Sequence, residues 1–305
     1  MNAGRPARLA VGVVSAGRVG AVLGAALHAI GHRVVAISGV SRASVHRAES
    51  LLPGVPLLPP DEVVQRADLA LLTVPDDVLP GLVRGLAAAG AFRPGQIVVH
   101  TAGSHGVGVL EPAVEHGVLP LALHPVMTFT GRPEDVQRLV SCPVSVTARL
   151  DDEAAWSVGE ALVLELGAEP VRVPEQVRPL YHAALSHGAN HLVTLVRDAV
   201  ELLDKAGVRP ADLLIAPLLS AALDNALRHG DRALTGPVAR GDTGTVAGHL
   251  RELEKADPDI AATYRALARR TAHRAVEGGL LPEHAAEEIR ALLDDPTSQN
   301  PGDPR

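Results

Sequence analysis

The stretch LAVGVVSAGRVG, residues 9–20, decides the fold of this chain. A short apolar run, Leu9–Val14, leads into a turn of small residues at 15–20, and an alanine-rich segment of helical character follows at 21–30. Strand, tight turn and helix in this order form the context in which a G-x-G-x-x-G turn binds the pyrophosphate of a dinucleotide. The first glycine of that pattern is replaced here by Ser15.

Each small residue of this turn has a physical role in such a site. Gly17 would let the backbone approach the phosphates, and Gly20 would let the helix pack closely on the strand. The free N–H groups at the helix start attract an anion, and the helix dipole adds to that attraction. We therefore predict that the whole turn binds a dinucleotide through Ser15, Ala16, Gly17, Arg18, Val19 and Gly20. The alternative is a purely structural turn.

The end of the second expected strand, 33–38, favours NADP over NAD. NAD sites usually place a carboxylate there to bind the ribose hydroxyl, but this chain has none near that point. Ser41 and Arg42 stand there instead, and a guanidinium with hydroxyl groups suits a 2′-phosphate. We predict that both residues bind the cofactor. The alternative is that Arg42 is a loop cation that caps the following helix.

Composition limits the class of protein. The chain has 305 residues, of which 47% are hydrophobic and only 2% aromatic, so two domains with cores of Ala, Val and Leu are expected. The net charge of −7 argues against a nucleic-acid partner. No apolar run reaches membrane-spanning length, and the first eight residues lack a secretory h-region, so a cytoplasmic location without membrane contact is expected. The single Cys142 excludes an internal disulfide, and no metal site is predicted.

The first half of the chain alternates strands and helices, which predicts an α/β domain at 9–174 with a doubly wound, mostly parallel sheet. Strands are expected at 9–14, 33–38, 68–74, 97–101, 119–123, 143–147 and 169–173. Helices are expected at 61–67, 78–89 and 152–166, with Pro75, Asp76 and Asp77 ending a strand and capping the second of them.

The second half, 175–293, has long helical patterns and no convincing strand, which predicts an all-helical domain. Its helices are expected at 179–206, 210–228, 243–255, 257–277 and 282–293. The segment 1–8 is expected to be flexible and the polar tail 294–305 disordered. The helices of 179–228 are rich in Leu and Ala, so we expect a homodimer formed through the helical domain.

Four blocks carry a resemblance to a known family, and a fifth adds to it. They are SAGRVG at 15–20, HTAGSHG at 100–106, LHPVMTF at 123–129, ALTGPVARGD at 233–242 and YHAALSHGANHLVTL at 181–195. Together they resemble the actinobacterial Rossmann-like oxidoreductases that carry a C-terminal domain of unknown function, DUF2520. The resemblance implies a Rossmann domain, an NADP cofactor and a layout similar to pyrroline-5-carboxylate reductase. Some members resemble an alternative ketopantoate reductase of pantothenate synthesis.

Candidate residues in the first domain follow the carboxyl ends of the expected strands, where a nicotinamide would lie. Val74 and Pro75 would pack on the cofactor, and Thr101 opens a loop of small residues that could pass close to it. His124 ends another strand and could donate a proton with a pKa near the working pH. A buried histidine bonded to backbone is the alternative.

Further candidates lie on the long helix and on the loop after the second helix. His182, Ser186 and Asn190 are four residues apart and share one helix face. Related hydroxyacid dehydrogenases carry Lys and Asn four apart here, and Ser186 replaces the lysine. Arg240 could bind a substrate carboxylate while Asp242 holds its guanidinium, or the pair could be an internal salt bridge.

These residues predict an NADPH-dependent reductase of a small 2-oxo acid, with ketopantoate as the leading specific substrate. Arg240 would hold the carboxylate, and His182 or His124 would protonate the oxygen. One alternative is imine reduction, which needs less acid help and suits the missing lysine. Another is an NADP-binding sensor or interaction protein that catalyses no turnover.

Overall fold

The computed structural model describes residues 8–294, and the contacts between residues divide the chain into two compact units, 1–187 and 188–305. The division falls inside the long helix that starts at Arg178. The sequence patterns placed the domain boundary earlier, between residues 174 and 175. Residues 1–7 and 295–305 lie outside the described part, and with them most of the expected flexible N-terminus and nearly all of the expected disordered tail.

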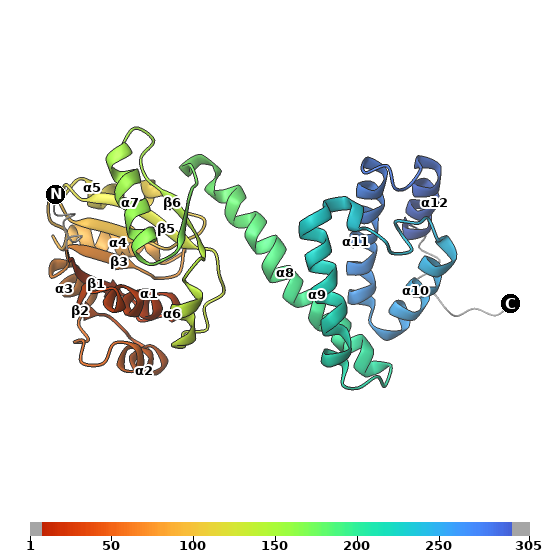
Figure 1. Ribbon diagram of the computed structural model, residues 1–305, viewed down its shortest axis with the longest axis horizontal. Coiled ribbons are helices and arrows are strands. Elements are labelled where there is room, and N and C mark those ends of the chain that lie inside the picture. The colour runs from red at the N-terminus through yellow and green to blue at the C-terminus, as the bar shows by residue number, and fades with distance from the viewer. Residues whose placement is uncertain (1–7, 295–305) are drawn as a thin grey trace, which may run out of the picture. The chain divides into compact units, whose positions relative to one another are not determined.

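The first unit is built on a seven-stranded sheet with the order β2-β1-β3-β4-β5-β6-β7 (Figure 1). The strands are β1 (Ala10–Val14), β2 (Arg33–Ile37), β3 (Leu69–Leu72), β4 (Ile97–His100), β5 (Leu119–Pro125), β6 (Pro143–Thr147) and β7 (Glu169–Arg172). The first five strands run parallel, β6 pairs antiparallel with β5, and β7 runs parallel to β6. The doubly wound, mostly parallel sheet expected from the sequence is thereby confirmed.

Helices cover both faces of the sheet, and the strand sequences explain why. Successive side chains of a strand point to opposite faces, so Leu69 and Leu71 join one apolar core while Ala70 and Leu72 join the other. The first core is covered by α1 (Arg18–Ala29) and α7 (Glu153–Glu165). The second is covered by α3 (Pro60–Gln65), α4 (Leu79–Ala88) and α5 (Glu111–Val114).

The remaining helices of this unit lie in its connections and at its C-terminal end. They are α2 (Arg42–Leu51), α6 (Glu134–Arg138), the 3₁₀ turns η1 (Val107–Leu110) and η2 (Glu175–Val177), and the first part of α8 (Arg178–Lys205). Because β1 to β5 run parallel, their carboxyl ends lie at one edge of the sheet. The candidate site lies at this edge.

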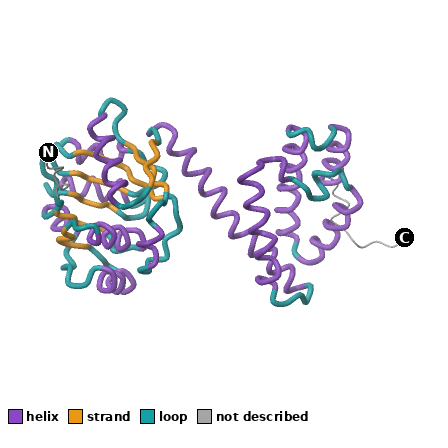
Figure 2. The backbone as a smooth tube through the Cα atoms, viewed as in Figure 1, coloured by secondary structure: helices purple, strands orange, loops and turns teal. Residues whose placement is uncertain are grey.

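The second unit is helical throughout its described part, and Figure 2 draws no strand in it. It comprises the rest of α8, then α9 (Ala211–His229), η3 (Gly230–Ala233), α10 (Thr243–Ala256), α11 (Pro258–Glu277) and α12 (Glu283–Asp294). Its core joins α10, α11 and α12 through small and aliphatic side chains such as Leu250, Ala272 and Ile289. Within residues 8–294, no helix is both long and apolar enough to cross a membrane.

Candidate functional site

The turn between β1 and α1 has a shape that admits only small residues. Ser15 has a φ of +81°, and its N–H donates to Ser38 Oγ at 2.8 Å. A Cβ built at Gly20 would lie 2.2 Å from the Ser15 carbonyl oxygen and 2.2 Å from Thr73 Oγ1. Real side chains do not approach backbone so closely, so glycine is required at position 20 by the packing itself.

The start of α1 is free of any side-chain cap. Gly17 is the N-cap residue, and no side chain accepts a hydrogen bond from the first turn of the helix. The first N–H groups of a helix have no partner inside it, and together with the helix dipole they attract an anion. The residues therefore fit a dinucleotide pyrophosphate, with Arg18 exposed and Ala16 buried beside this end of the helix.

A second arginine borders this turn and was missed by the sequence analysis. Arg47, on α2, donates from Nε to the Ala16 carbonyl oxygen at 3.2 Å. The loop after β5 packs on it, because a Cβ built at Gly131 would lie 2.8 Å from Arg47 Cδ and 3.2 Å from Arg18 Cγ. The contact of Arg47 joins residues 31 apart in the sequence, so no local motif could have indicated it.

The two residues expected to bind an NADP phosphate lie at the start of α2. Arg42 is the first residue of the helix and is exposed. Ser41 is its N-cap, and its Oγ accepts a hydrogen bond from the Ser44 N–H at 3.1 Å. The Ser41 hydroxyl is thus already engaged in capping, whereas the Arg42 guanidinium forms no hydrogen bond or ion pair with residues 8–294. The binding roles of both residues stay predictions.

The carboxyl ends of β3 and β4 are joined by a hydrogen-bonded pair of loops. Asp76 follows β3, and its Oδ2 accepts hydrogen bonds from Ser104 N–H at 3.2 Å and Ser104 Oγ at 2.5 Å. Burial raises the pKa of Asp76, but the Ser104 hydrogen bonds and the charges of His182 and His105 together hold it below its usual value. Asp76 is therefore an ionised carboxylate at this edge of the sheet.

The expected cap of the next helix is wrong. The N-cap of α4 is Val78, which makes no side-chain cap, and Asp76 bonds to Ser104 instead. Val74 is half-buried and Pro75 exposed after β3, while Thr101 is half-buried after β4 and donates its N–H to the Leu72 carbonyl oxygen at 3.3 Å. These three residues lie at the predicted edge, and their contact with a cofactor stays a prediction.

A fully buried arginine supports the loop that follows β4. Arg178, the first residue of α8, is 0% exposed. Its Nη1 donates to Thr147 Oγ1 at 2.7 Å and its Nη2 to the Ala102 carbonyl oxygen at 2.8 Å, while its Nε has no partner. No carboxylate among residues 8–294 forms an ion pair with it. Burial lowers its pKa, and its positive charge lies beneath the loop.

Three ring side chains converge beside this loop. His124 Nδ1 and the Tyr181 hydroxyl form a hydrogen bond 2.9 Å long, and the rings of His124 and His182 lie edge to face with centroids 6.1 Å apart. A Cβ built at Gly103 would lie 2.4 Å from His182 Cδ2 and 3.1 Å from His124 Nε2. Glycine at position 103 thus allows both predicted histidines to approach the same loop.

The protonation state expected for His124 is wrong. Burial lowers its pKa to about 4, and the positive charges of Arg178 and His182 lower it further. His124 is therefore a neutral imidazole near pH 7 rather than an acid that titrates there. It can still form a hydrogen bond with Tyr181, a residue for which the sequence predicted no role.

Neighbouring His100 has a structural role. It is 0% exposed, its Nε2 is hydrogen-bonded to the Gly106 carbonyl oxygen at 2.9 Å, and its Nδ1 accepts from the Ala102 N–H at 3.2 Å. Burial lowers its pKa to about 3. His100 therefore shapes the loop 101–106 from below as a neutral side chain.

The remaining predicted residues lie further along the chain. Ser186 lies one turn beyond His182 on α8, within the first unit, and Asn190 lies in the part of α8 that belongs to the second unit. Asn190 and Arg240 are exposed. Both residues belong to the second unit, and their substrate roles stay predictions.

The expected pairing of Arg240 with Asp242 is wrong. The Arg240 guanidinium donates to the Thr235 carbonyl oxygen. Asp242 caps α10, accepting from the Thr245 N–H at 3.0 Å and the Thr245 hydroxyl at 2.7 Å. No ion pair within 4.0 Å joins the two residues in the described chain, because the carboxylate is occupied by the helix start.

Comparison with family models matches both halves of the chain. A Rossmann-like domain matches residues 2–125, and the domain of unknown function DUF2520 matches residues 142–271. Comparison with curated proteins gives no significant match.

Solved structures share the fold over most of this chain. A candidate NADP oxidoreductase of Bacteroides fragilis is 24% identical, with a TM-score of 0.73 over 87% of this chain and 98% of its own. An imine reductase of Myxococcus stipitatus in complex with NADP⁺ is 18% identical, with a TM-score of 0.60 over 88% and 95%. Pyrroline carboxylate reductase of Plasmodium falciparum with bound NADP is 11% identical, with a TM-score of 0.54 over 94% and 98%.

The family matches agree with the geometry. The match to the Rossmann-like domain contains the glycine turn and the strands whose carboxyl ends carry Asp76 and His124, and the DUF2520 match begins at β6 and contains Arg178. The chain is thus a Rossmann-like domain followed by a DUF2520 domain, as the resemblance of its sequence blocks implied.

Proposed function

We propose that this protein is an NADP-dependent reductase of small-molecule substrates. The observation that carries the proposal is the turn at 15–20, where Gly20 is fixed by packing against Ser15 and Thr73 and the start of α1 is uncapped. Such a turn suits a pyrophosphate. Solved structures of the same fold, named as an NADP oxidoreductase, an imine reductase and a pyrroline carboxylate reductase, support a redox role.

The preference for NADP rests on the charges around the end of β2. Ser38 ends this strand region in place of a carboxylate, and Arg42 and Arg47 both stand on the helix that follows. Arg47 uses only its Nε to bond Ala16, and its two terminal nitrogens have no partner among residues 8–294. A guanidinium with free terminal nitrogens is suited to a phosphate, so Arg47 joins Arg42 as a candidate for the ribose phosphate.

Imine reduction is the reaction that the side chains of the first unit favour. Bound NADPH would supply a hydride. Asp76 is ionised at the carboxyl edge of the sheet, and its negative charge would stabilise a cationic iminium group. His124 is neutral near pH 7. An iminium ion already carries its proton, so it needs none from His124 before the hydride is transferred.

Reduction of a 2-oxo acid, with ketopantoate as the specific candidate, is favoured by a different observation. The hydrogen bond between His124 and Tyr181 links two neutral groups, and either could donate to a carbonyl oxygen. The buried charge of Arg178 would favour the negative charge that develops on that oxygen.

The experiment has two stages on the full chain. Calorimetry first measures binding of NADPH and NADH, and we expect uptake of NADPH with the higher affinity. Absorbance of the reduced nicotinamide then follows turnover with a cyclic imine such as pyrroline-5-carboxylate and with ketopantoate. No uptake of either coenzyme by folded protein would overturn the proposal. Uptake without turnover across a broad imine and carbonyl panel would instead support the sensor alternative.

A further inference from the structure

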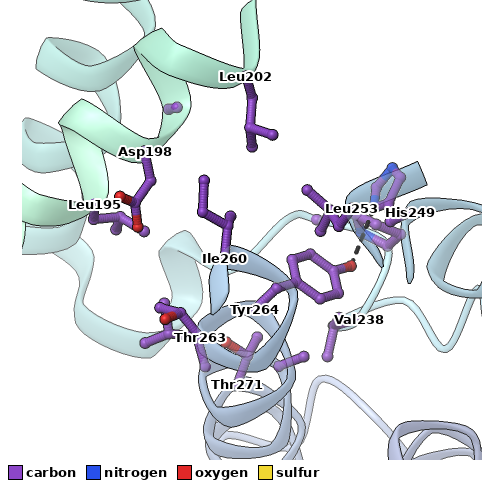
Figure 3. Close-up of a pocket in the computed structure, with 15 residues that line it drawn as sticks. Leu195, Asp198, Leu202, Val238, His249, Leu253, Ile260, Thr263, Tyr264 and Thr271 are labelled. Carbon is purple, nitrogen blue, oxygen red and sulfur yellow. Dashed lines mark hydrogen bonds between the residues drawn. The ribbon is translucent and has the colours of Figure 1, made fainter. Parts of the chain in front are cut away.

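The helical unit holds a pocket that the candidate site at the sheet edge does not use (Figure 3). Its volume is about 320 Å³, and α8, α10, α11 and the loop 236–238 line it. All of its residues belong to the second unit, so the pocket is complete within one compact body. Its size is within the range of small-molecule sites in proteins.

The walls of this pocket are mainly hydrocarbon. Leu195 and Leu202 contribute from α8, Leu253 from α10, and Ile260 and Leu267 from α11. Leu195 is 43% exposed and Leu267 44% exposed, so part of this apolar wall is open to solvent. Covering it with an apolar ligand would remove that surface from water, which is favourable in proportion to the area buried.

A carboxylate interrupts the apolar wall. Asp198 lines the pocket from α8 and is half-buried, and in Figure 3 it extends from that helix into the region between α8 and α11. It has no hydrogen bond or ion pair with any described residue. A bound cation would supply this carboxylate with both a hydrogen-bond donor and a compensating charge.

The other polar groups of the pocket are already paired or weakly polar. His249 Nδ1 and the Tyr264 hydroxyl form a hydrogen bond 3.0 Å long, drawn as a dashed line in Figure 3. Thr263 donates its hydroxyl to the Asp259 carbonyl oxygen of its own helix. Asp198 is therefore the one charged group of the lining without a partner in the described chain, and the Tyr264 ring adds an aromatic face of the kind that attracts cations.

We infer that this pocket binds a hydrophobic amine, with its ammonium group on Asp198 and its hydrocarbon body against the leucines and Ile260. The charge of Asp198 disfavours anionic ligands. A neutral apolar ligand would gain binding free energy only from the apolar surface that it buries. The inference does not depend on the proposed reductase activity, because it concerns binding by residues of the helical unit alone. It is tested without cofactor.

The experiment uses two probes of matched shape, phenylbutylamine and phenylbutanol, and measures their binding to the full chain by calorimetry at a pH where the amine is protonated. We expect the amine to bind more tightly than the alcohol. Replacement of Asp198 with Asn should weaken amine binding by about tenfold, as loss of a charge-assisted hydrogen bond does, and leave alcohol binding nearly unchanged. Glu201→Gln is the matched control, since Glu201 is exposed on the same helix and does not line the pocket.

A second variant tests the location without relying on charge. Thr263→Trp places a large ring in the pocket from an exposed position, so the fold should be retained while both probes lose affinity. Circular dichroism and the melting temperature confirm folding of each variant. The inference is overturned by equal binding of amine and alcohol, by no binding of either, or by equal losses in Asp198→Asn and Glu201→Gln.

Discussion

The carboxylate of Asp76 accepts two hydrogen bonds from Ser104, one from the amide at 3.2 Å and one from the hydroxyl at 2.5 Å. The two residues are 28 apart in the sequence and follow two neighbouring parallel strands. The pair joins the loops at the carboxyl ends of β3 and β4, so it fixes both the charge and the shape of the edge where a nicotinamide would lie.

Replacement of Ser104 with Ala tests the ionisation of Asp76. The hydroxyl stabilises the ionised carboxylate, so its removal should raise the pKa of Asp76. Burial acts on this pKa in the same upward direction. A lost hydrogen bond to a charged group costs about 1.5–3 kcal/mol, which corresponds to a shift of about one pKa unit or more. The acid limb of the pH–rate profile for imine reduction should move to higher pH.

The control for this variant is Ser157→Ala, because Ser157 is an exposed serine of α7 whose hydroxyl only donates to the Glu153 carbonyl oxygen. It should leave the pH–rate profile in place. An acid limb that stays at the same pH in Ser104→Ala would show that Asp76 does not control the rate.

The neutral state of His124 predicts how stability depends on pH. Its pKa is about 4 in the folded chain against an ordinary value of 6.5. Between these values the unfolded chain binds a proton that the folded chain does not, so the free energy of unfolding falls as pH is lowered through this window. The loss amounts to about 3 kcal/mol for this residue.

Urea unfolding at several pH values across this window measures the effect. His124→Gln cannot titrate and should show a shallower fall than the parent chain, with part of the fall remaining because buried His100 also has a lowered pKa. Equal slopes for the parent and His124→Gln would contradict the assignment. Asp76 and Asp135 also have pKa values lowered from the ordinary 3.8, so they add to the fall at the acidic end of this window, where unfolded carboxylates begin to bind protons. That part of the fall should be the same in the parent chain and in His124→Gln.

The glycine turn gives a prediction on cofactor binding. Gly20→Ala would place a Cβ at 2.2 Å from the Ser15 carbonyl oxygen and from Thr73 Oγ1, so the turn must shift and NADPH affinity should fall by at least tenfold. Gly85→Ala is the control, since nothing lies within 4 Å of its Cβ in α4. It should keep NADPH affinity and stabilise the chain by about 0.5–1 kcal/mol. Calorimetry with NADPH and thermal unfolding distinguish the two variants.

Much of the fold could be predicted because its signals are local. The apolar run at 143–147 became β6 with the bounds expected, and the expected helix at 243–255 became α10 with one residue added. The antiparallel direction of β6 could not be predicted, since it depends on the connection through α6, whose short polar sequence Glu134–Arg138 resembles a loop. The connection between two strands decides whether they run parallel or antiparallel, and the sequences of the strands themselves contain little information on it.

The candidate site was only partly predictable for a related reason. The turn at 15–20 and the two histidines were found from motifs and from their places after strands. Arg47 and Arg178 were missed, because each contacts backbone or side chains more than 30 residues away. The pKa of His124 was misjudged because it depends on burial and on the charge of Arg178, neither of which the sequence around His124 contains.

Arg178 should act on His124 through its charge. Arg178→Met keeps a long side chain but removes the donors to Thr147 and Ala102, which should cost about 1–3 kcal/mol of stability. It also removes one of the charges that lower the pKa of His124, so that pKa should rise above about 4. NMR titration of the histidine ring protons measures this shift. A loss of stability with an unmoved His124 pKa would restrict Arg178 to a packing role.

The proposed homodimer rests on the apolar side chains of α9. Leu213 is 69% exposed, Leu218 68%, Leu223 51% and Leu227 80%. At 100° per residue these leucines point to different sides of the helix, and a helix that is apolar all round is normally buried. A second copy of the chain would cover this surface, so we expect a dimer at micromolar concentration by analytical ultracentrifugation.

Charge placed on α9 tests the dimer directly. Leu218→Lys and Leu227→Lys together should shift the chain to monomers, because each lysine would have to be buried without a partner in the interface. Their exposure in the single chain means that the monomer should keep its fold by circular dichroism. Leu280→Lys is the control, as Leu280 is 40% exposed outside α9 and should not change the mass in solution. A parent chain that sediments as a monomer, or a double variant that stays dimeric, would place the interface elsewhere or remove it.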